Sequence, residues 1–264
     1  MAGDPPPSAF ATGAASGGRG SSALAIVRAL LAYTWAIAFL AVVLPIGLLV
    51  YPFDRKQRYH DVLAVVWARG ILALVGVRVE ASGVENAAPD QAYVVVSNHQ
   101  STLDIPAVLV ALAARIPLRF VAKRSIFWVP VLGWGMRLYG HAPVGRDSVK
   151  GSLAGLEGAR RHVARRWSTF FFPEGTRTRD GSLQPFRLGA FRIASSAGAR
   201  VLPISVDGSF AVMPRHRLAP RPGVLRVTIH PPLPAPDSTL SALRTAAAQC
   251  QEVIATHLGG GSAS

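Results

Sequence analysis

The sequence predicts an α/β fold, a single layered domain with a mixed, largely parallel sheet of seven strands flanked by helices. An N-terminal membrane-inserting helix or helical hairpin precedes it. Short β-rich runs alternate with helical patterns beyond residue 76, which is typical of such a layered sheet. An uncharged apolar stretch comes before them, and the length of 264 residues suffices for one large domain. The single cysteine, Cys250, excludes an internal disulfide framework.

The N-terminal region is predicted to hold the protein at a lipid surface. Residues 1–22 are mostly small residues and proline, so we expect a disordered tail. The next segment, Ala29 to Val50, has 22 residues without a charge, enough to cross a hydrocarbon core of about 30 Å. Pro45 leaves open a re-entrant hairpin. A cleaved signal peptide fits less well, because the run is long and no small-residue cleavage site follows it.

Cations follow the apolar run directly. Arg55, Lys56 and Arg58 favour a cytoplasmic location for the rest of the chain, at the inner membrane. A second apolar stretch over residues 62–77 is interrupted by Arg69, so it predicts an interfacial or buried helix. We therefore divide the chain into a tail (1–22), a membrane-anchoring helical segment (23–76), a folded domain (77–258) and a flexible C-terminal tail (259–264).

The folded domain shows the periodicity of an α/β sheet. Seven β-rich runs predict strands, at residues 77–81, 92–97, 118–122, 141–144, 168–172, 201–206 and 225–229. Helical patterns lie between several of them, at residues 105–114, 152–166 and 189–197, and a helix-like segment over residues 240–258 ends the domain.

The formal charge of +14 attracts anionic partners without identifying one. Nucleic acid, anionic lipid and phosphorylated substrates all fit this charge. Part of the excess can instead reflect a GC-rich genome, which gives a chain rich in arginine and alanine. The cations form no recognisable nucleic-acid motif, so we expect no nucleic-acid partner. Apart from His99, the histidines show no ligand spacing, and we expect no metal.

The segment from Val94 to Pro106 reads as strand, turn and helix. Ser101, Thr102 or Asp104 can cap the helix. Residues five apart on one helix lie about 140° apart around its axis, so His99 must lie in the turn if it is to meet Asp104. The carboxylate of Asp104, in the first turn of the helix, can then accept a hydrogen bond from one ring nitrogen of His99. This fixes the tautomer of the imidazole and leaves its other nitrogen free to take a proton.

This pair is the base and orienting half of a catalytic triad without a serine. No G-x-S-x-G motif is present, so the incoming acceptor supplies the hydroxyl and no covalent acyl-enzyme forms. A capped helix with a hydrogen-bonded structural histidine gives the same pattern.

A second cluster ends another apolar strand, in the order Phe170-Phe171-Phe172-Pro173-Glu174-Gly175-Thr176-Arg177-Thr178. Proline and glycine turn the chain, and arginine presents a planar cation suited to phosphate. Glutamate can anchor the loop or bind a hydroxyl. An ordinary β-turn with a solvated salt bridge is the alternative interpretation.

Together, His99-x-x-x-x-Asp104 and the block from Phe172 to Arg177 resemble the glycerolipid acyltransferases, specifically the 1-acyl-glycerol-3-phosphate acyltransferases. The resemblance covers roughly residues 60–230. Two further blocks match the family pattern, at residues 140–146 and 201–204. The resemblance identifies residues 77–258 as an acyltransferase catalytic domain.

The resemblance implies roles for particular residues. His99 and Asp104 are expected to be catalytic, and Arg177 with Glu174, Gly175 and Thr176 to contact the glycerol phosphate. Lys123 resembles the family's additional phosphate-binding lysine, and Arg146 is expected to help bind the acceptor.

The resemblance also implies substrates. The acceptor is lysophosphatidic acid, acylated at its sn-2 hydroxyl to phosphatidic acid, and the donor is acyl-CoA or acyl-carrier protein, with no further cofactor. Gly145 stands where the family commonly has Asp or Asn, which leaves glycerol 3-phosphate or a lyso-aminolipid open as acceptor. A non-catalytic membrane protein that binds anionic lipid is the competing hypothesis.

Overall fold

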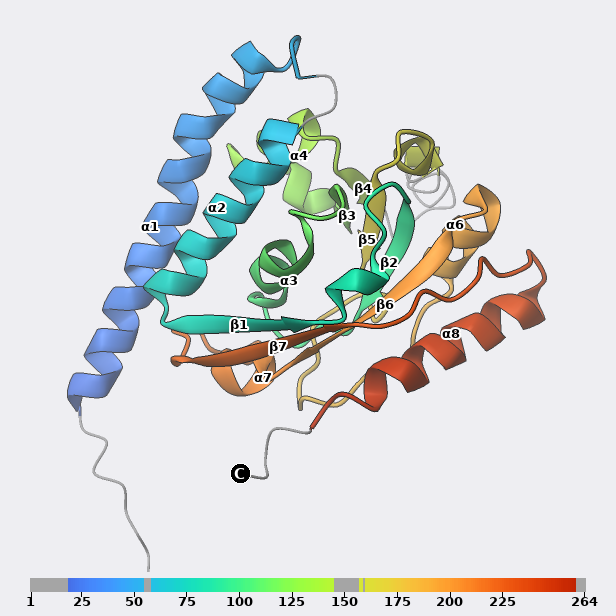
Figure 1. Cartoon of the computed structure of the whole chain (residues 1–264). Coiled ribbons are helices and arrows are strands. Elements are labelled where there is room, and N and C mark those ends of the chain that lie inside the picture. The colour runs from blue at the N-terminus through green and yellow to red at the C-terminus, as the bar shows by residue number, and fades with distance from the viewer. Residues whose placement is uncertain (1–18, 55–57, 145–156, 159, 260–264) are drawn as a thin grey trace, which may run out of the picture.

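A computed structural model describes residues 19–54, 58–144, 157–158 and 160–259 of the chain (Figure 1). Residues 1–18 of the predicted N-terminal tail (1–22) and residues 260–264 of the predicted C-terminal tail (259–264) lie outside the described residues. Of the predicted helix over residues 152–166, residues 152–156 and 159 do too, whereas residues 157–158 and 160–164 are helical.

Seven strands form one sheet in the order β1-β7-β6-β2-β5-β3-β4. All neighbouring strands are parallel except β6 and β7, which are antiparallel. This confirms the predicted mixed, largely parallel sheet, and each strand overlaps a predicted run. Their bounds are β1 (Val77–Ser82), β2 (Tyr93–Ser97), β3 (Leu118–Lys123), β4 (Ala142–Val144), β5 (Ser168–Phe171), β6 (Arg200–Asp207) and β7 (Gly223–Ile229).

Helices cover both faces of the sheet (Figure 1). On one face α2 (Arg58–Leu74) and α3 (Asp104–Leu112) pack on a core that includes Val95 of β2. On the other face α6 (Gly189–Ala197) and α8 (Leu240–Ala255) pack on Val94 and Val96. Every residue of β2 is therefore buried, which explains why its sequence is continuously apolar rather than alternating.

Shorter helices complete the domain. They are η1 (Val84–Asn86), η2 (Arg124–Trp128), α4 (Leu132–Leu138) and α7 (Ser209–Val212).

The N-terminal segment is a helical hairpin that lies against one side of the domain. Helix α1 (Arg19–Val50) is continuous through Pro45, and the chain reverses only after Val50, so Pro45 does not create a re-entrant turn. The two helices exchange indole hydrogen bonds: Trp35 donates to the carbonyl of Trp67 over 3.2 Å, and Trp67 donates to that of Ala36 over 3.3 Å.

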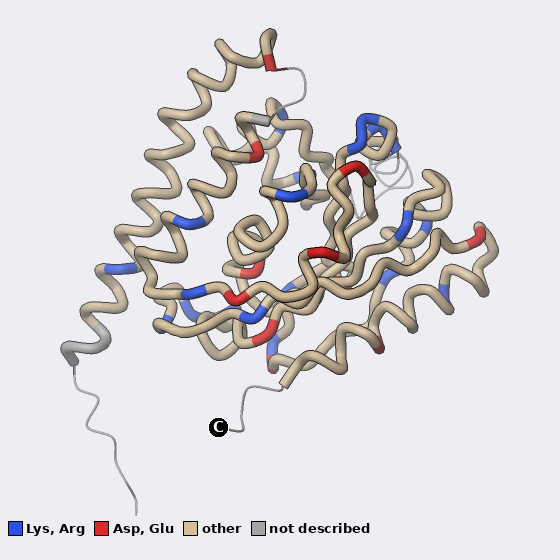
Figure 2. Tube along the Cα trace, viewed as in Figure 1, with Lys and Arg blue, Asp and Glu red and all other residues tan. Residues whose placement is uncertain are grey.

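The exposed surface of α1 is apolar. Residues 23–50 are long and hydrophobic enough to cross a membrane, and only 6% of the most apolar window is buried against the protein. Figure 2 shows this helix almost without charged residues along its length. Its start at Arg19 falls inside the predicted tail of residues 1–22.

Candidate active site

The loops that follow β2 and β5 lie side by side because these two strands pair in parallel, with Val96 opposite Phe171. The carboxyl ends of parallel strands meet at the same edge of a sheet, which is where α/β enzymes place their active sites. The first loop carries His99, and the second carries Glu174 and Arg177. Two segments about 75 residues apart in the sequence, as the separation of His99 and Glu174 shows, thus form one site.

His99 and Asp104 form the pair that the sequence predicts. Nδ1 of His99 lies 2.9 Å from Oδ2 of Asp104. The carboxylate is fully buried, whereas the imidazole is 16% exposed. Because an ionised carboxylate only accepts hydrogen bonds, Nδ1 carries the proton of the neutral ring. Nε2 is then the unprotonated nitrogen, free to accept a proton from a substrate.

Asp104 also shapes the turn between β2 and α3. Its Oδ2 accepts the main-chain N–H groups of Gln100 and Ser101, each over 2.8 Å. The expected side-chain cap on α3 is absent, since the N-cap residue, Leu103, makes no side-chain cap hydrogen bond. The carboxylate instead sits in the first helical turn and binds the preceding loop, which brings His99 back over it.

Buried polar side chains fix this turn to the rest of the sheet. The side-chain amide of Asn98 donates to the carbonyl of Val206 and accepts its N–H, both over 2.8 Å. The hydroxyl of Ser101 donates to the carbonyl of Met213 over 2.8 Å. These contacts attach the turn between β2 and α3 to β6 and to the segment that follows α7.

The second loop covers the histidine. The ring of Phe172 stacks on that of His99, with centroids 3.7 Å apart and planes 13° apart. The N–H of Thr178 donates to the carbonyl of His99 over 2.9 Å. The imidazole is therefore held between a carboxylate at Nδ1 and an aromatic ring on one face, and it cannot rotate freely.

Glu174 connects the two loops through backbone hydrogen bonds. One carboxylate oxygen accepts the N–H of His99, and the other accepts the N–H of Gln184 over 3.0 Å. The residue is only 5% exposed. Burial raises the pKa of this carboxyl to about 7, while the two N–H donors oppose that rise and the charge of Asp104 adds to it. This geometry favours the loop-anchoring role over direct contact with a substrate hydroxyl.

Arg177 contacts the turn between β2 and α3 and keeps part of its side chain in solvent. Its Nη1 donates to the hydroxyl of Thr102 over 2.7 Å, and the side chain remains partly exposed. Gly175 has a φ of +76°, a conformation that favours glycine and turns the chain between Glu174 and Arg177. Thr176 is exposed at this turn.

The remaining predicted site residues are Lys123 and Arg146. Lys123 is exposed at the carboxyl end of β3, the strand that pairs with β5, and so lies at the same edge of the sheet. No hydrogen bond or ion pair among the described residues joins it to His99 or Arg177. Arg146 lies outside the described residues.

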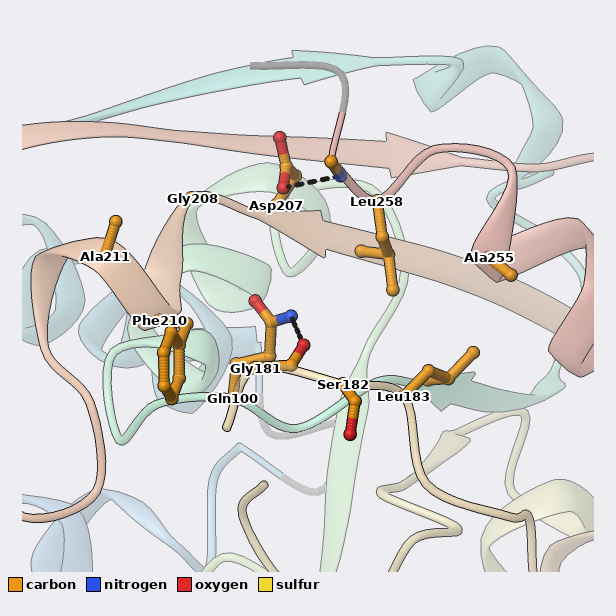
Figure 3. A pocket seen from close by; sticks show the side chains of 11 residues that line it. Gln100, Gly181, Ser182, Leu183, Asp207, Gly208, Phe210, Ala211, Ala255 and Leu258 are labelled. Atoms are coloured by element: carbon orange, nitrogen blue, oxygen red, sulfur yellow. Dashed lines mark hydrogen bonds between the residues drawn. The ribbon is translucent and has the colours of Figure 1, made fainter. Parts of the chain in front are cut away.

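A cavity of about 410 Å³ adjoins the turn between β2 and α3 (Figure 3). Gln100 lines it, and the side-chain amide of this residue donates to the carbonyl of Gly181 over 2.9 Å. Leu183, Phe210 and Leu258 give the cavity an apolar wall. The cavity thus lies on the side of the turn toward which Gln100 points.

Several supporting residues could not be identified from the sequence. Phe172 and Thr178 belong to the segment from Phe170 to Thr178, but the sequence does not indicate that they contact His99. Gln184 lies after that segment. Their roles depend on which loop folds over which. Among the described residues, no group of three or more His, Cys, Asp or Glu side chains could hold a metal ion.

Known proteins are similar to this chain in sequence and in fold. A sequence model of the family described as Acyltransferase matches residues 78–207. The chain is 38% identical over 184 residues, 69% of its length, to a chloroplastic 1-acyl-sn-glycerol-3-phosphate acyltransferase of Brassica napus, of which the match covers 52%. It is 33% identical over 233 residues to the 1-acyl-sn-glycerol-3-phosphate acyltransferase of Chlamydomonas reinhardtii, covering 86% of this chain and 69% of that protein.

The fold is also similar to that of a solved structure. The crystal structure of the 1-acyl-sn-glycerophosphate acyltransferase of Thermotoga maritima superposes with a TM-score of 0.75 at 26% identity, covering 89% of this chain and 92% of that one. Against the plant relative, the match spans about half of the longer protein.

Proposed function

Since the chain belongs to the family of 1-acyl-sn-glycerol-3-phosphate acyltransferases, we propose that it transfers an acyl group to the sn-2 hydroxyl of 1-acylglycerol 3-phosphate, forming phosphatidic acid. The donor is an acyl thioester, either acyl-CoA or acyl-carrier protein. The single observation that supports this most directly is the hydrogen bond of 2.9 Å between His99 Nδ1 and Asp104 Oδ2.

His99 acts as the general base. With Nδ1 donating to Asp104, Nε2 takes the proton from the acceptor hydroxyl as its oxygen attacks the thioester carbonyl. The buried carboxylate stabilises the imidazolium that forms, as the orienting acid does in a triad. Collapse of the tetrahedral intermediate breaks the carbon–sulfur bond, and the proton on Nε2 passes to the leaving thiolate. Because the acceptor oxygen attacks the thioester carbonyl directly, the ester forms in one transfer and no covalent acyl-enzyme is needed.

The acceptor phosphate is held by cations at the same edge of the sheet. Arg177 is positioned by Thr102 close to the turn between β2 and α3, residues 98–103, which we call the catalytic turn. Its planar guanidinium can bind phosphate through two N–H groups. Lys123 adds a second positive charge at the end of β3. Two cations neutralise a phosphate dianion, which favours this acceptor over an uncharged alcohol.

The contacts of α1 support a hairpin that lies in one leaflet instead of crossing the bilayer. Tyr33 donates its hydroxyl to the carbonyl of Leu218, and Gly47 packs against Tyr139 at the end of α4. These contacts lie 14 residues, or about 21 Å, apart along the helix. A helix that crossed the membrane would draw this side of the catalytic domain through much of a hydrocarbon core of about 30 Å.

A helix parallel to the surface keeps the domain in water. The exposed side chains of α1 then enter the apolar part of one leaflet, and the site faces a substrate that is itself a lipid. The cations at residues 55, 56 and 58 favour the cytoplasmic leaflet of the inner membrane.

Purified His99→Ala protein tests the catalytic proposal. With acyl-CoA and 1-acylglycerol 3-phosphate in neutral detergent micelles, thiol release is expected to fall by about 10³-fold or more. The exposed His257→Ala is the matched control and should retain activity. Near-normal turnover of a folded His99→Ala variant would show that the base is another group. A panel with glycerol 3-phosphate and a lyso-aminolipid determines the acceptor.

A further inference from the structure

The segment between α7 and β7, residues 213–222, forms a closed loop that connects the catalytic turn to the membrane hairpin. We call it the arginine loop. The N–H of Arg221 donates to the carbonyl of Val212 over 2.9 Å and closes its base. At its start, the carbonyl of Met213 accepts the hydroxyl of Ser101, which belongs to the catalytic turn. Near its tip, the carbonyl of Leu218 accepts the hydroxyl of Tyr33 on α1 over 3.3 Å.

The arginine loop carries a concentrated positive charge. Its ten residues include Arg215, Arg217 and Arg221 and contain no carboxylate. Arg215 and Arg221 are exposed, and Arg217 is half-buried. Within the part of the chain that the structure describes, none of the three forms an ion pair. Three cations without acidic neighbours attract an anionic surface.

The tip of the loop is apolar. Leu218 is 76% exposed, and its backbone contacts α1 through Tyr33. Neighbouring side chains on that helix, Leu30 and Leu31, are also exposed, at 60% and 52%. The leucine therefore continues the apolar surface of the hairpin and is flanked in sequence by arginines. An apolar side chain among cations suits the boundary between acyl chains and headgroups.

We propose that the arginine loop docks on the anionic headgroups of the leaflet in which α1 lies, with Leu218 inserted among the lipids. The proposal rests on the membrane placement in the proposed function. An acidic protein would complement the arginines but would not account for the exposed leucine joined to α1. A membrane with anionic phospholipid satisfies both features.

This docking would concentrate acceptor near the site. Lysophosphatidic acid is itself an anionic lipid, and the loop begins at Met213, in contact with the catalytic turn. Headgroup binding at the loop therefore holds the surface from which the substrate arrives close to His99.

Vesicle flotation of the full chain tests whether the charge of the arginine loop contributes to membrane binding. The triple variant Arg215→Ala, Arg217→Ala, Arg221→Ala is compared with a control triple, Arg192→Ala, Arg200→Ala, Arg244→Ala. The control removes the same charge from exposed positions on the layer of α6, β6 and α8. Vesicles contain phosphatidylcholine alone, or equal parts phosphatidylcholine and phosphatidylglycerol.

Each arginine close to an anionic surface strengthens binding about fivefold. The loop triple is therefore expected to bind the mixed vesicles about 100-fold more weakly, with little change on phosphatidylcholine, whereas the control triple binds as wild type does.

A fluorescent label tests the insertion of the tip. Cys250 is fully buried, and burial raises the pKa of its thiol, so it reacts slowly with a maleimide. An environment-sensitive dye on Leu218→Cys should shift to shorter wavelength on mixed vesicles and be quenched by lipids that carry a quencher in the acyl chain. The same dye on Leu240→Cys, an exposed leucine at the start of α8, should show neither effect.

The proposal is wrong if the loop triple binds mixed vesicles as tightly as the control triple, or if the dye at position 218 stays unshifted. It is also wrong if the loop triple binds vesicles normally but fails to use acyl-carrier protein as donor, since the loop would then dock a protein. Acyl transfer in neutral detergent is measured alongside. If the wild-type protein transfers no acyl group in detergent, the proposed function is refuted. The vesicle measurements do not depend on activity, so they test the docking proposal separately.

Discussion

The main-chain N–H of His99 donates to a carboxylate oxygen of Glu174, so the loop that follows β5 holds the backbone of the residue that we propose as the general base. The pKa of Glu174 lies near 7, above the ordinary value of 4.5. Between these values the native state keeps a proton that the unfolded chain releases. The contribution of Glu174 to stability is therefore greatest below pH 4.5 and falls as the pH rises to about 7.

Replacement by glutamine removes this titration. We expect the stability of wild type relative to Glu174→Gln to fall by about 2 kcal/mol between about pH 5 and pH 8, after allowance for partial solvent screening. Denaturant unfolding at both pH values measures it. The exposed Glu252→Gln should follow the wild-type pH dependence. A stability difference between wild type and Glu174→Gln that stays constant with pH contradicts the raised pKa.

The charge of Asp104 is expected to matter more for catalysis than for folding. In Asp104→Asn the side-chain oxygen can still accept the N–H groups of Gln100 and Ser101 and that of the imidazole, but it no longer stabilises an imidazolium. We expect kcat to fall by on the order of 10³-fold. The loss of charge-assisted hydrogen bonds should cost about 1–3 kcal/mol of stability.

Steady-state kinetics with thermal unfolding separate these two effects, and the exposed Asp237→Asn provides a control. A folded Asp104→Asn protein whose kcat is within twofold of wild type, a margin of about 0.4 kcal/mol, would refute the orienting role.

Arg177 is predicted to act on the acceptor. If its guanidinium binds phosphate, Arg177→Ala should raise the KM for 1-acylglycerol 3-phosphate by about 10- to 100-fold and leave the KM for the donor nearly unchanged. The KM of Arg177→Lys for the acceptor should lie between those of wild type and Arg177→Ala, because lysine keeps the charge but lacks the planar guanidinium. Arg179→Ala, on an exposed neighbour in the same loop, should change neither value. Equal changes in both KM values for Arg177→Ala contradict phosphate binding.

Much of the fold follows from the sequence because strand and helix patterns are local. Short β-rich runs mark all seven strands, and the predicted helix at Gly189 to Ala197 has the observed bounds. The order of strands depends on which distant segments pair, and no local pattern states that β5 lies between β2 and β3. The antiparallel pairing of β7 with β6 is non-local in the same way.

The same distinction applies to the site. His99 and Asp104 could be paired from their spacing, because five residues suffice for a turn entering a helix. The stacking of Phe172 and the anchoring by Glu174 join loops from two strands, so they required the fold. Pro45 left open a chain reversal within the apolar segment, but α1 continues through this proline.

The packing of the hairpin offers a test that leaves the site untouched. At Gly70 of α2, an added Cβ would lie 2.2 Å from Nε1 of Trp35 on α1. The indole cannot keep its hydrogen bond to the Trp67 carbonyl with a methyl group there. We therefore expect Gly70→Ala to separate the two helices locally and to lower the free energy of unfolding by about 1–3 kcal/mol.

Gly189→Ala supplies the matched control, because no heavy atom lies within 4 Å of an added Cβ at the start of α6. Alanine there should be neutral or stabilise by up to about 1 kcal/mol, since it restricts the unfolded chain. Thermal unfolding in neutral detergent compares the two variants. If Gly70→Ala were as stable as Gly189→Ala, the indole of Trp35 could not be packed against α2, and the hairpin would be held to the domain by other contacts.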